Sequence, residues 1–431
     1  MDNFYQLTSK NINNKIGLIK KYLNNRNHLF SGKYNKIENS IETNKIEAKD
    51  INKEKINRIN NYQKIIKKRN TGIDLLRIIA MIGIVFAHIL YQGKGLDKYQ
   101  RYNKKIKILF TYIFWHVNTF GIISGIIGYK STKYSNLLYL WLCAVFYSVS
   151  IHYYYLIYKH DFSIKDELYI EYYPIIYKRY WYLTSYFGMF IFLPAINKGI
   201  QYLNKSEFKL LVMSILGIFV FWQTYIKNKG DSFNMNAGHS IIWLLCLYII
   251  GAYIGKFNVE YTGIKRNIFS FIYLFIFLLL CSIHNKYRYY IISGLVGNYK
   301  IKLVSFIKRL ITFEPFCVIK TTQAIFITSF FLQLKYNEYL SKFITFFGPL
   351  TFGVYLIHFN RIVRKNYLSK LLNGESYNLE FNEVIKMLIL KSLKLFLECI
   401  IIEYFRNLLF TILKIRKICM SIEYLAFKIV S

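Results

Sequence analysis

Apolar stretches of membrane-spanning length recur along this chain of 431 residues, and they constrain its fold more than any other feature. A helix needs about 20 apolar residues to cross the hydrocarbon core of a bilayer, where its backbone hydrogen bonds must be made within the segment. We predict ten spanning helices, at 73–92, 106–128, 136–158, 180–203, 208–226, 239–256, 267–283, 316–334, 344–362 and 384–413. The fold class expected is all-α, a polytopic membrane bundle of about ten transmembrane helices.

The composition agrees with a membrane protein. Hydrophobic residues make up 54% of the chain and aromatic residues 19%, which is rare for a single soluble domain of this size. The last predicted span is the weakest, because six charged residues interrupt it: Lys386, Lys391, Lys394, Glu398, Glu403 and Arg406. The six cysteines form no Cys-x-x-Cys motif, so neither disulfides nor a metal site are expected.

The chain divides into three regions by composition. Residues 1–70 form a basic, low-complexity N-terminal tail, 71–413 the transmembrane domain, and 414–431 a short basic C-terminal tail. Within the first tail, Ile12, Ile16 and Ile19 recur at helical spacing; this fits an amphipathic helix on a membrane surface, and equally a tail with transient helix. The formal charge of +35 is interpreted as attraction to anionic lipid, and no nucleic-acid partner is expected.

Basic residues beside the spans set the expected orientation. A cluster at 64–69 immediately precedes the first span, and cytoplasmic loops carry the excess of lysine and arginine. The N-terminus is therefore expected in the cytoplasm, and ten spans return the C-terminus to the same side. The expected location is the cell (plasma) membrane.

The first span contains an ionisable pair, Arg77 and His88. They are eleven positions apart, so they lie about three helical turns and about 16 Å apart on one helix face. Ionisable side chains within a span are costly and are functional candidates by default. Asp74 precedes Arg77 by one turn, close enough to orient the guanidinium and to offset its burial.

Five stretches of the chain form a consistent series of motifs. They are Gly72–Arg77 with His88 after ten further residues, then Val117–Tyr129, Lys130–Lys133, Tyr180–Asn197 and Gly348–His358. In order and spacing they resemble the membrane acyltransferase 3 family, particularly its polysaccharide O-acetyltransferase branch with its Arg-x10-His signature. Where many members have Arg-x-x-Arg, this chain has Lys130 and Lys133, which keep the charge and lose the bidentate fork.

The resemblance implies a donor and an acceptor on opposite sides of the membrane. Acetyl-CoA, or another acyl-CoA, is the expected cytoplasmic donor, and no permanently bound cofactor or metal is expected. Histidine suits the removal of a hydroxyl proton near neutral pH, so His88 is the general base or, alternatively, a transient acyl carrier. Arg77 would position the donor with help from Asp74. Lys130 and Lys133 would contact the coenzyme A phosphates or, equally, serve as ordinary cytoplasmic anchors of the spans.

Three further residues are candidates for the substrate cavity, each with a structural alternative. His358 lines the cavity or packs near the end of its span, and Asn118 faces the cavity or bonds a neighbouring helix. Trp181 contacts a sugar or belongs to an interfacial aromatic belt. Without the resemblance, Arg77 could equally extend to the headgroups and His88 could be an ordinary core histidine.

The function expected is an integral membrane O-acyltransferase. It would transfer acetyl from cytoplasmic acetyl-CoA to a hydroxyl of a cell-surface polysaccharide or its lipid-linked precursor. Its partners would be the acyl-CoA donor, the glycan or lipid-linked glycan acceptor and membrane lipids. The alternatives are a multi-pass transporter (or flippase) and a polymerase for lipid-linked glycans.

Overall fold

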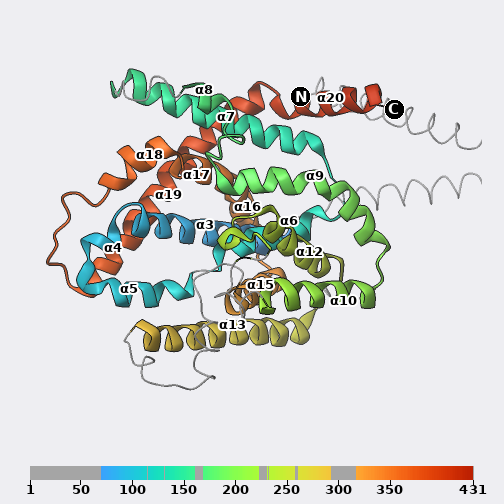
Figure 1. Ribbon diagram of the computed structural model, residues 1–431, viewed down its shortest axis with the longest axis horizontal. Helices are drawn as coiled ribbons and strands as arrows, with labels where there is room; N and C mark the ends of the chain where they lie inside the picture. Colours follow the sequence, from blue (N-terminus) through green and yellow to red (C-terminus); the bar gives the residue numbers. More distant parts are fainter. Residues whose placement is uncertain are drawn as a thin grey trace, which may run out of the picture. The chain divides into compact units, whose positions relative to one another are not determined.

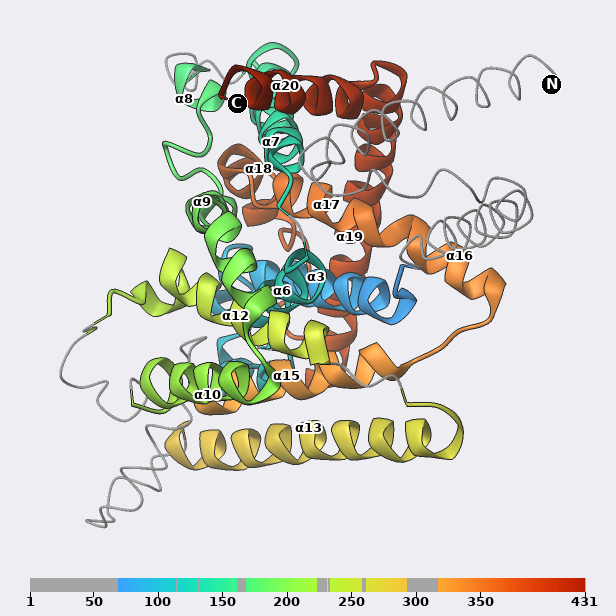
Figure 2. The same ribbon diagram turned by 90° about the vertical axis from the view of Figure 1, so that its right-hand side faces the viewer.

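The computed structural model describes residues 69–113, 115–130, 132–160, 168–222, 231, 233–257, 261–292 and 317–430, and every regular element within them is a helix. The amphipathic helix considered for the N-terminal tail lies outside these residues. The helices are, in chain order, α3 (Thr71–Tyr91), α4 (Gly95–Lys98), α5 (Asn103–Leu109), α6 (His116–Gly128), α7 (Tyr134–Ile157), α8 (Leu168–Tyr172), α9 (Trp181–Tyr202), α10 (Lys205–Ile215), α12 (Ile241–Phe257), α13 (Gly263–Ile292), α15 (Val318–Gln333), α16 (Glu338–Phe347), α17 (Thr351–His358), α18 (Arg361–Asn366), α19 (Phe381–Ile412) and α20 (Ile415–Val430). Figures 1 and 2 show their arrangement.

The helical class is confirmed, whereas the count of about ten spans is not. Among the described residues, four segments are long and apolar enough to cross a bilayer, namely Thr71–Tyr91, Tyr134–Ile157, Gly263–Lys286 and Glu338–His358. The single span predicted at 106–128 is divided, because α5 ends at Leu109, a 3-10 turn follows at Phe110–Tyr112, and α6 begins at His116.

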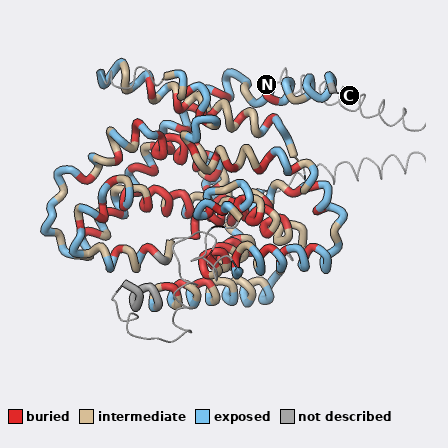
Figure 3. Tube along the Cα trace, viewed as in Figure 1, coloured by how far each residue is buried: buried red, intermediate tan, exposed pale blue. Residues whose placement is uncertain are grey.

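Helix α3 lies at the centre of the bundle. Its N-terminal end begins at a cap in which the Asn70 side chain accepts a hydrogen bond from the Ile73 amide at 3.0 Å. The first half of α3 packs into a hydrophobic cluster with α6, α12 and α15, and its second half into another with α7, α17 and α19. Two-thirds of its apolar window (67%) is buried, and Figure 3 shows mostly buried residues at the centre of the bundle. The central helix therefore connects both halves of the core.

Helix α13 lies at the edge of the bundle. It packs against α15, and only 17% of its apolar window is buried. Both views in Figures 1 and 2 place it along one border of the molecule. Its exposed residues include Phe271, Phe275 and Leu278, large apolar side chains that suit lipid rather than water. This contrast with α3 is the pattern expected when one helix faces protein and the other faces hydrocarbon.

Two of the charges that interrupt the last predicted span neutralise each other inside the fold. On α19, Arg406 donates to Glu403 through Nη2 at 2.5 Å and Nε at 3.0 Å. The Glu403 carboxylate also accepts the Tyr147 hydroxyl at 2.6 Å, and Arg406 donates to the Tyr139 hydroxyl at 3.0 Å. A buried ion pair that is hydrogen-bonded on both sides is compatible with an apolar helix bundle, because neither charge is left uncompensated.

The C-terminal basic tail contains a helix. Helix α20 packs against α7, and the two lie together at the same border of the molecule in Figures 1 and 2. The Glu423 carboxylate accepts a hydrogen bond from the Tyr134 amide at 2.6 Å, at the N-terminal end of α7. A carboxylate at a helix N-terminus is favoured by the free amide groups and by the helix dipole. The segment is therefore fixed to the body of the bundle.

Candidate active site

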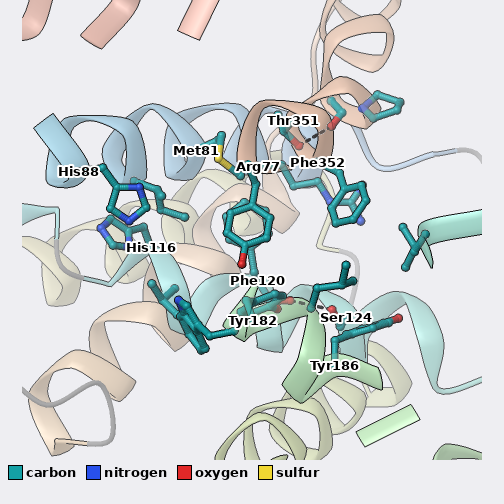
Figure 4. A pocket seen from close by; sticks show the side chains of 18 of the residues that line it. Arg77, Met81, His88, His116, Phe120, Ser124, Tyr182, Tyr186, Thr351 and Phe352 are labelled. Atoms are coloured by element: carbon teal, nitrogen blue, oxygen red, sulfur yellow. Dashed lines mark hydrogen bonds between the residues drawn. The ribbon is translucent and has the colours of Figure 1, made fainter. Parts of the chain in front are cut away.

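A cavity of about 300 Å³ opens along the face of α3 that carries Arg77 and His88. Figure 4 shows these two side chains on one helix, with Phe120, Tyr182 and Tyr186 on the opposite wall. The lining comes from α3, α6, α7, α9 and the α16–α17 region, and comprises Arg77, Met81, Ile84, Ala87, His88, His116, Val117, Phe120, Ser124, Leu140, Trp181, Tyr182, Leu183, Tyr186, Gly348, Pro349, Thr351, Phe352 and Tyr355. Mostly apolar walls with a few polar groups are typical of a small-molecule site.

Two histidines form a hydrogen-bonded pair beside this cavity. Nδ1 of His88 lies 2.8 Å from Nε2 of His358, and Nδ1 of His358 lies 2.5 Å from the Val354 carbonyl oxygen. The carbonyl oxygen can only accept, so Nδ1 of His358 must carry a proton. In neutral His358, Nε2 is then the acceptor, and Nδ1 of His88 is the donor.

This arrangement fixes the chemistry of His88. With Nδ1 donating to His358, the lone pair of neutral His88 belongs to Nε2. His88 lines the cavity, whereas His358, on the far side of His88, is completely buried and does not line it. A base held in one tautomer by a second group follows the logic of the serine-protease triad, in which the orienting residue itself does not touch the substrate.

At the arginine end of the cavity, α3 and the turn at Gly348 approach each other closely. Arg77 donates to the Asp74 carboxylate at 2.9 Å, with 1% of the Asp74 side chain exposed and 22% of the Arg77 side chain. A Cβ added at Gly348 would lie 2.8 Å from the Asp74 Cβ, nearer than real Cβ contacts. The turn that begins α17 therefore packs directly against the ion pair because residue 348 has no side chain.

The structure places the sequence-predicted site residues differently with respect to this cavity. Arg77, His88 and Trp181 line the cavity; Asp74 and His358 support them from behind. Asn118 does not line it, because its side chain accepts the Trp243 indole N–H at 3.2 Å between α6 and α12. The interhelical alternative given above is the one found for this residue.

Lys130 and Lys133 also lie away from the lining of this cavity. Both are exposed, and the Lys130 Nζ lies 5.7 Å from the centre of the Tyr129 ring. Lys133 lines a separate cavity, next to α20. Contact between these lysines and the coenzyme A phosphates stays a prediction.

Several lining residues were not among the predicted site residues. His116, Tyr182, Tyr186 and Tyr355 all reach the cavity. The sequence offered one signal for the two tyrosines of α9, since positions 182 and 186 share a face with spacing i, i+4.

Trp181, which was predicted, packs edge-on to His239, with ring centres 4.1 Å apart. It is therefore held by the residue segment just before α12 as well as facing the cavity.

Among the residues that the structure describes, no group of three or more His, Cys, Asp or Glu side chains is arranged to hold a metal ion. Arg77 places a cation at one end of the cavity, and the hydrogen-bonded His88–His358 pair lies at the other.

A protein-family model of the acyltransferase 3 family, described as an acyltransferase domain, matches residues 70–383. This confirms the resemblance drawn from the sequence motifs. Comparison with curated proteins and with solved structures gives no match. The matched residues include the whole cavity lining, whereas most of α19 and all of α20 lie beyond them.

Proposed function

The chain belongs to the acyltransferase 3 family, and we propose that this membrane protein is an acetyl-CoA-dependent O-acetyltransferase acting on a cell-surface polysaccharide or its lipid-linked precursor. The observation that carries the proposal is the hydrogen bond between His88 and His358, which leaves Nε2 of a cavity-lining histidine as a base. The family does not favour the transporter and polymerase interpretations.

The proposed step is transfer of an acyl group from sulfur to oxygen. Nε2 of His88 accepts the proton of the acceptor hydroxyl while the oxygen attacks the thioester carbonyl carbon. The C–O bond forms, the C–S bond breaks, and the departing thiolate takes the proton back from the His88 imidazolium. Nδ1–H of that imidazolium stays hydrogen-bonded to neutral His358, which supports the positive charge during the step.

Arg77 is proposed to bind the acyl donor. Its guanidinium lines the same cavity as His88, about 16 Å along the helix axis, and Asp74 restricts its orientation. With the N-terminus in the cytoplasm, Arg77 lies toward the cytoplasmic half of α3 and His88 toward the outer half. Coenzyme A would then approach from the cytoplasmic side, and the glycan hydroxyl from the other.

Mass spectrometry of surface glycans tests the proposal in cells. A deletion strain should lose the acetyl mass from its glycans while keeping their chain length, and the wild-type gene should restore it. His88→Ala and Arg77→Ala, present in the membrane at normal levels, should fail to restore it. His152→Ala is the matched control, because His152 is a buried histidine of α7 that does not line the cavity.

Two outcomes of this experiment would count against the proposal. Full acetylation by His88→Ala would refute the proposal, and loss of whole glycan chains in the deletion strain would favour transport or polymerisation instead. A separate experiment on the protein itself distinguishes the two chemical roles of His88. An acetyl group trapped on the His88 ring when acceptor is absent would identify the residue as an acyl carrier rather than a base.

A further inference from the structure

A second cavity adjoins the one that Arg77 lines. It measures about 180 Å³ and shares three lining residues with the first, Leu140, Pro349 and Phe352. Pro349 follows Gly348, which packs against the Asp74 partner of Arg77, so the shared wall is at the arginine end of the first cavity. The buried Arg406 also lines the second cavity. The second cavity therefore lies between the first cavity and the α7–α19 interface.

A third cavity of about 500 Å³ adjoins the second on the side of α20. The two share Asn136, Tyr139 and Arg416, and the third is also lined by Lys133. The three cavities are thus consecutive, with His88 at one end and two cations at the other. We call the third cavity, lined by Lys133, Ser135, Asn136, Tyr139, Arg416, Met420, Glu423, Tyr424 and Phe427, the outer chamber.

The outer chamber combines positive charge with aromatic surface. The Arg416 guanidinium carbon lies 4.2 Å from the centre of the Tyr139 ring, a stacked position that leaves the N–H groups at its edge available to an anion. The one carboxylate of its lining, Glu423, accepts the Tyr134 amide. Tyr424 is largely exposed and offers an aromatic face, of the kind on which a base ring stacks.

We propose that the outer chamber binds the nucleotide end of the acyl donor, with Arg416 as a phosphate-binding residue alongside Lys133. Coenzyme A joins an adenine and phosphates to a thioester by a long flexible arm, and the row of cavities has the same order: cations and aromatic rings first, then Arg77, then His88. The arm would pass through the second cavity. The proposal rests on the proposed function and adds a donor contact from α20, outside the family-matched residues 70–383.

The chain offers a matched pair of cations for the test. Arg416 and Lys417 are adjacent, and both are exposed on α20, but only Arg416 lines the outer chamber. In the purified full-length protein, Arg416→Gln should weaken binding of coenzyme A about tenfold, as expected for losing a charge-assisted hydrogen bond. Lys417→Gln should leave the affinity at the wild-type value, and Arg416→Lys should fall between.

A truncated donor shows whether the effect acts through phosphate. S-acetylpantetheine keeps the thioester and arm and lacks the nucleotide, so its kcat/KM should be the same in Arg416→Gln and the wild type. With acetyl-CoA, Arg416→Gln should raise KM about tenfold and leave kcat unchanged.

The proposal is overturned if Arg416→Gln weakens coenzyme A binding no more than Lys417→Gln does. It is also overturned if Arg416→Gln impairs use of S-acetylpantetheine to the same degree as acetyl-CoA, since that would indicate damage to the fold. Failure of the wild type to transfer acetyl from acetyl-CoA would instead refute the proposed function itself.

Discussion

A single hydrogen bond decides which nitrogen of His88 can act as a base. The spacing of Arg77 and His88 was sufficient to predict that both share a face of one helix, and both line one cavity. The contact with His358 was not predictable in the same way, because the two histidines are 270 positions apart and meet only through the packing of α17 against α3. Local periodicity fixes a face, whereas the partner across that face is a property of the tertiary structure.

Removal of His358 should slow the chemical step without weakening substrate binding. His358→Ala is expected to lower kcat about 10- to 100-fold, because His88 loses the acceptor that fixes its tautomer, while KM for acetyl-CoA stays within about twofold. Steady-state kinetics of the purified protein measure both. Added imidazole fits the space left by the ring and should restore part of kcat. A change confined to KM, or no rescue, would count against an orienting role.

Asp74 should act only through Arg77. Arg77→Ala is expected to reduce kcat/KM for acetyl-CoA about tenfold or more, and Asp74→Asn by a smaller factor, because a charge-assisted hydrogen bond is lost. In the double variant, the second substitution should add nothing to the first. Additive losses in this cycle would show that Asp74 contributes independently of the arginine.

At the scale of elements, the site depends on the close packing of the α17 turn on α3. Sequence motifs located Gly348–His358 but gave no reason for its first glycine, which the contact with Asp74 supplies. The predicted span at 106–128 was wrong as one element, because the apolar run continues through residues that form a turn. There, the Trp115 indole donates to the Tyr112 carbonyl at 2.7 Å. Hydropathy alone does not mark such a break.

Adding one methyl group at this contact should disturb the site. Gly348→Ala is expected to lower stability by about 1–3 kcal/mol, as overpacking does, and to reduce activity by displacing the Asp74–Arg77 pair. Gly199→Ala on α9 is the matched control, because a Cβ there would meet no atom within 4 Å. Thermal unfolding in detergent compares the two. Equal midpoints for both variants would contradict the packing argument.

At the scale of the whole molecule, composition was enough for the helical membrane class and the motifs were enough for the family. Composition could not explain the charges of α19. The Glu403–Arg406 pair is local, at spacing i,i+3, but the Tyr147 and Tyr139 hydroxyls that complete its hydrogen bonds come from α7. The basic C-terminal segment likewise carried no signal that it would pack against α7 and contribute to a cavity. Both features depend on contacts between distant parts of the chain.

The proposed orientation predicts which side of the membrane each end of the cavity row faces. All six cysteines are buried, so an introduced surface cysteine can be labelled selectively. Lys417→Cys should react with a membrane-impermeant maleimide in inverted vesicles and not in intact cells. Asp97→Cys, on the exposed side of the short helix α4 that follows α3, should react in intact cells and not in inverted vesicles. The reverse pattern would place the donor end outside and contradict the orientation.

The central claim is that His88 is the base for acyl transfer, and acetyl transfer by the purified protein tests it most directly. With radiolabelled acetyl-CoA and the acceptor glycan, the account predicts that His88→Ala lowers kcat by about 10²- to 10⁴-fold relative to the wild type and to His152→Ala. Retention of the wild-type rate by His88→Ala, in protein that unfolds at the wild-type temperature, would contradict it.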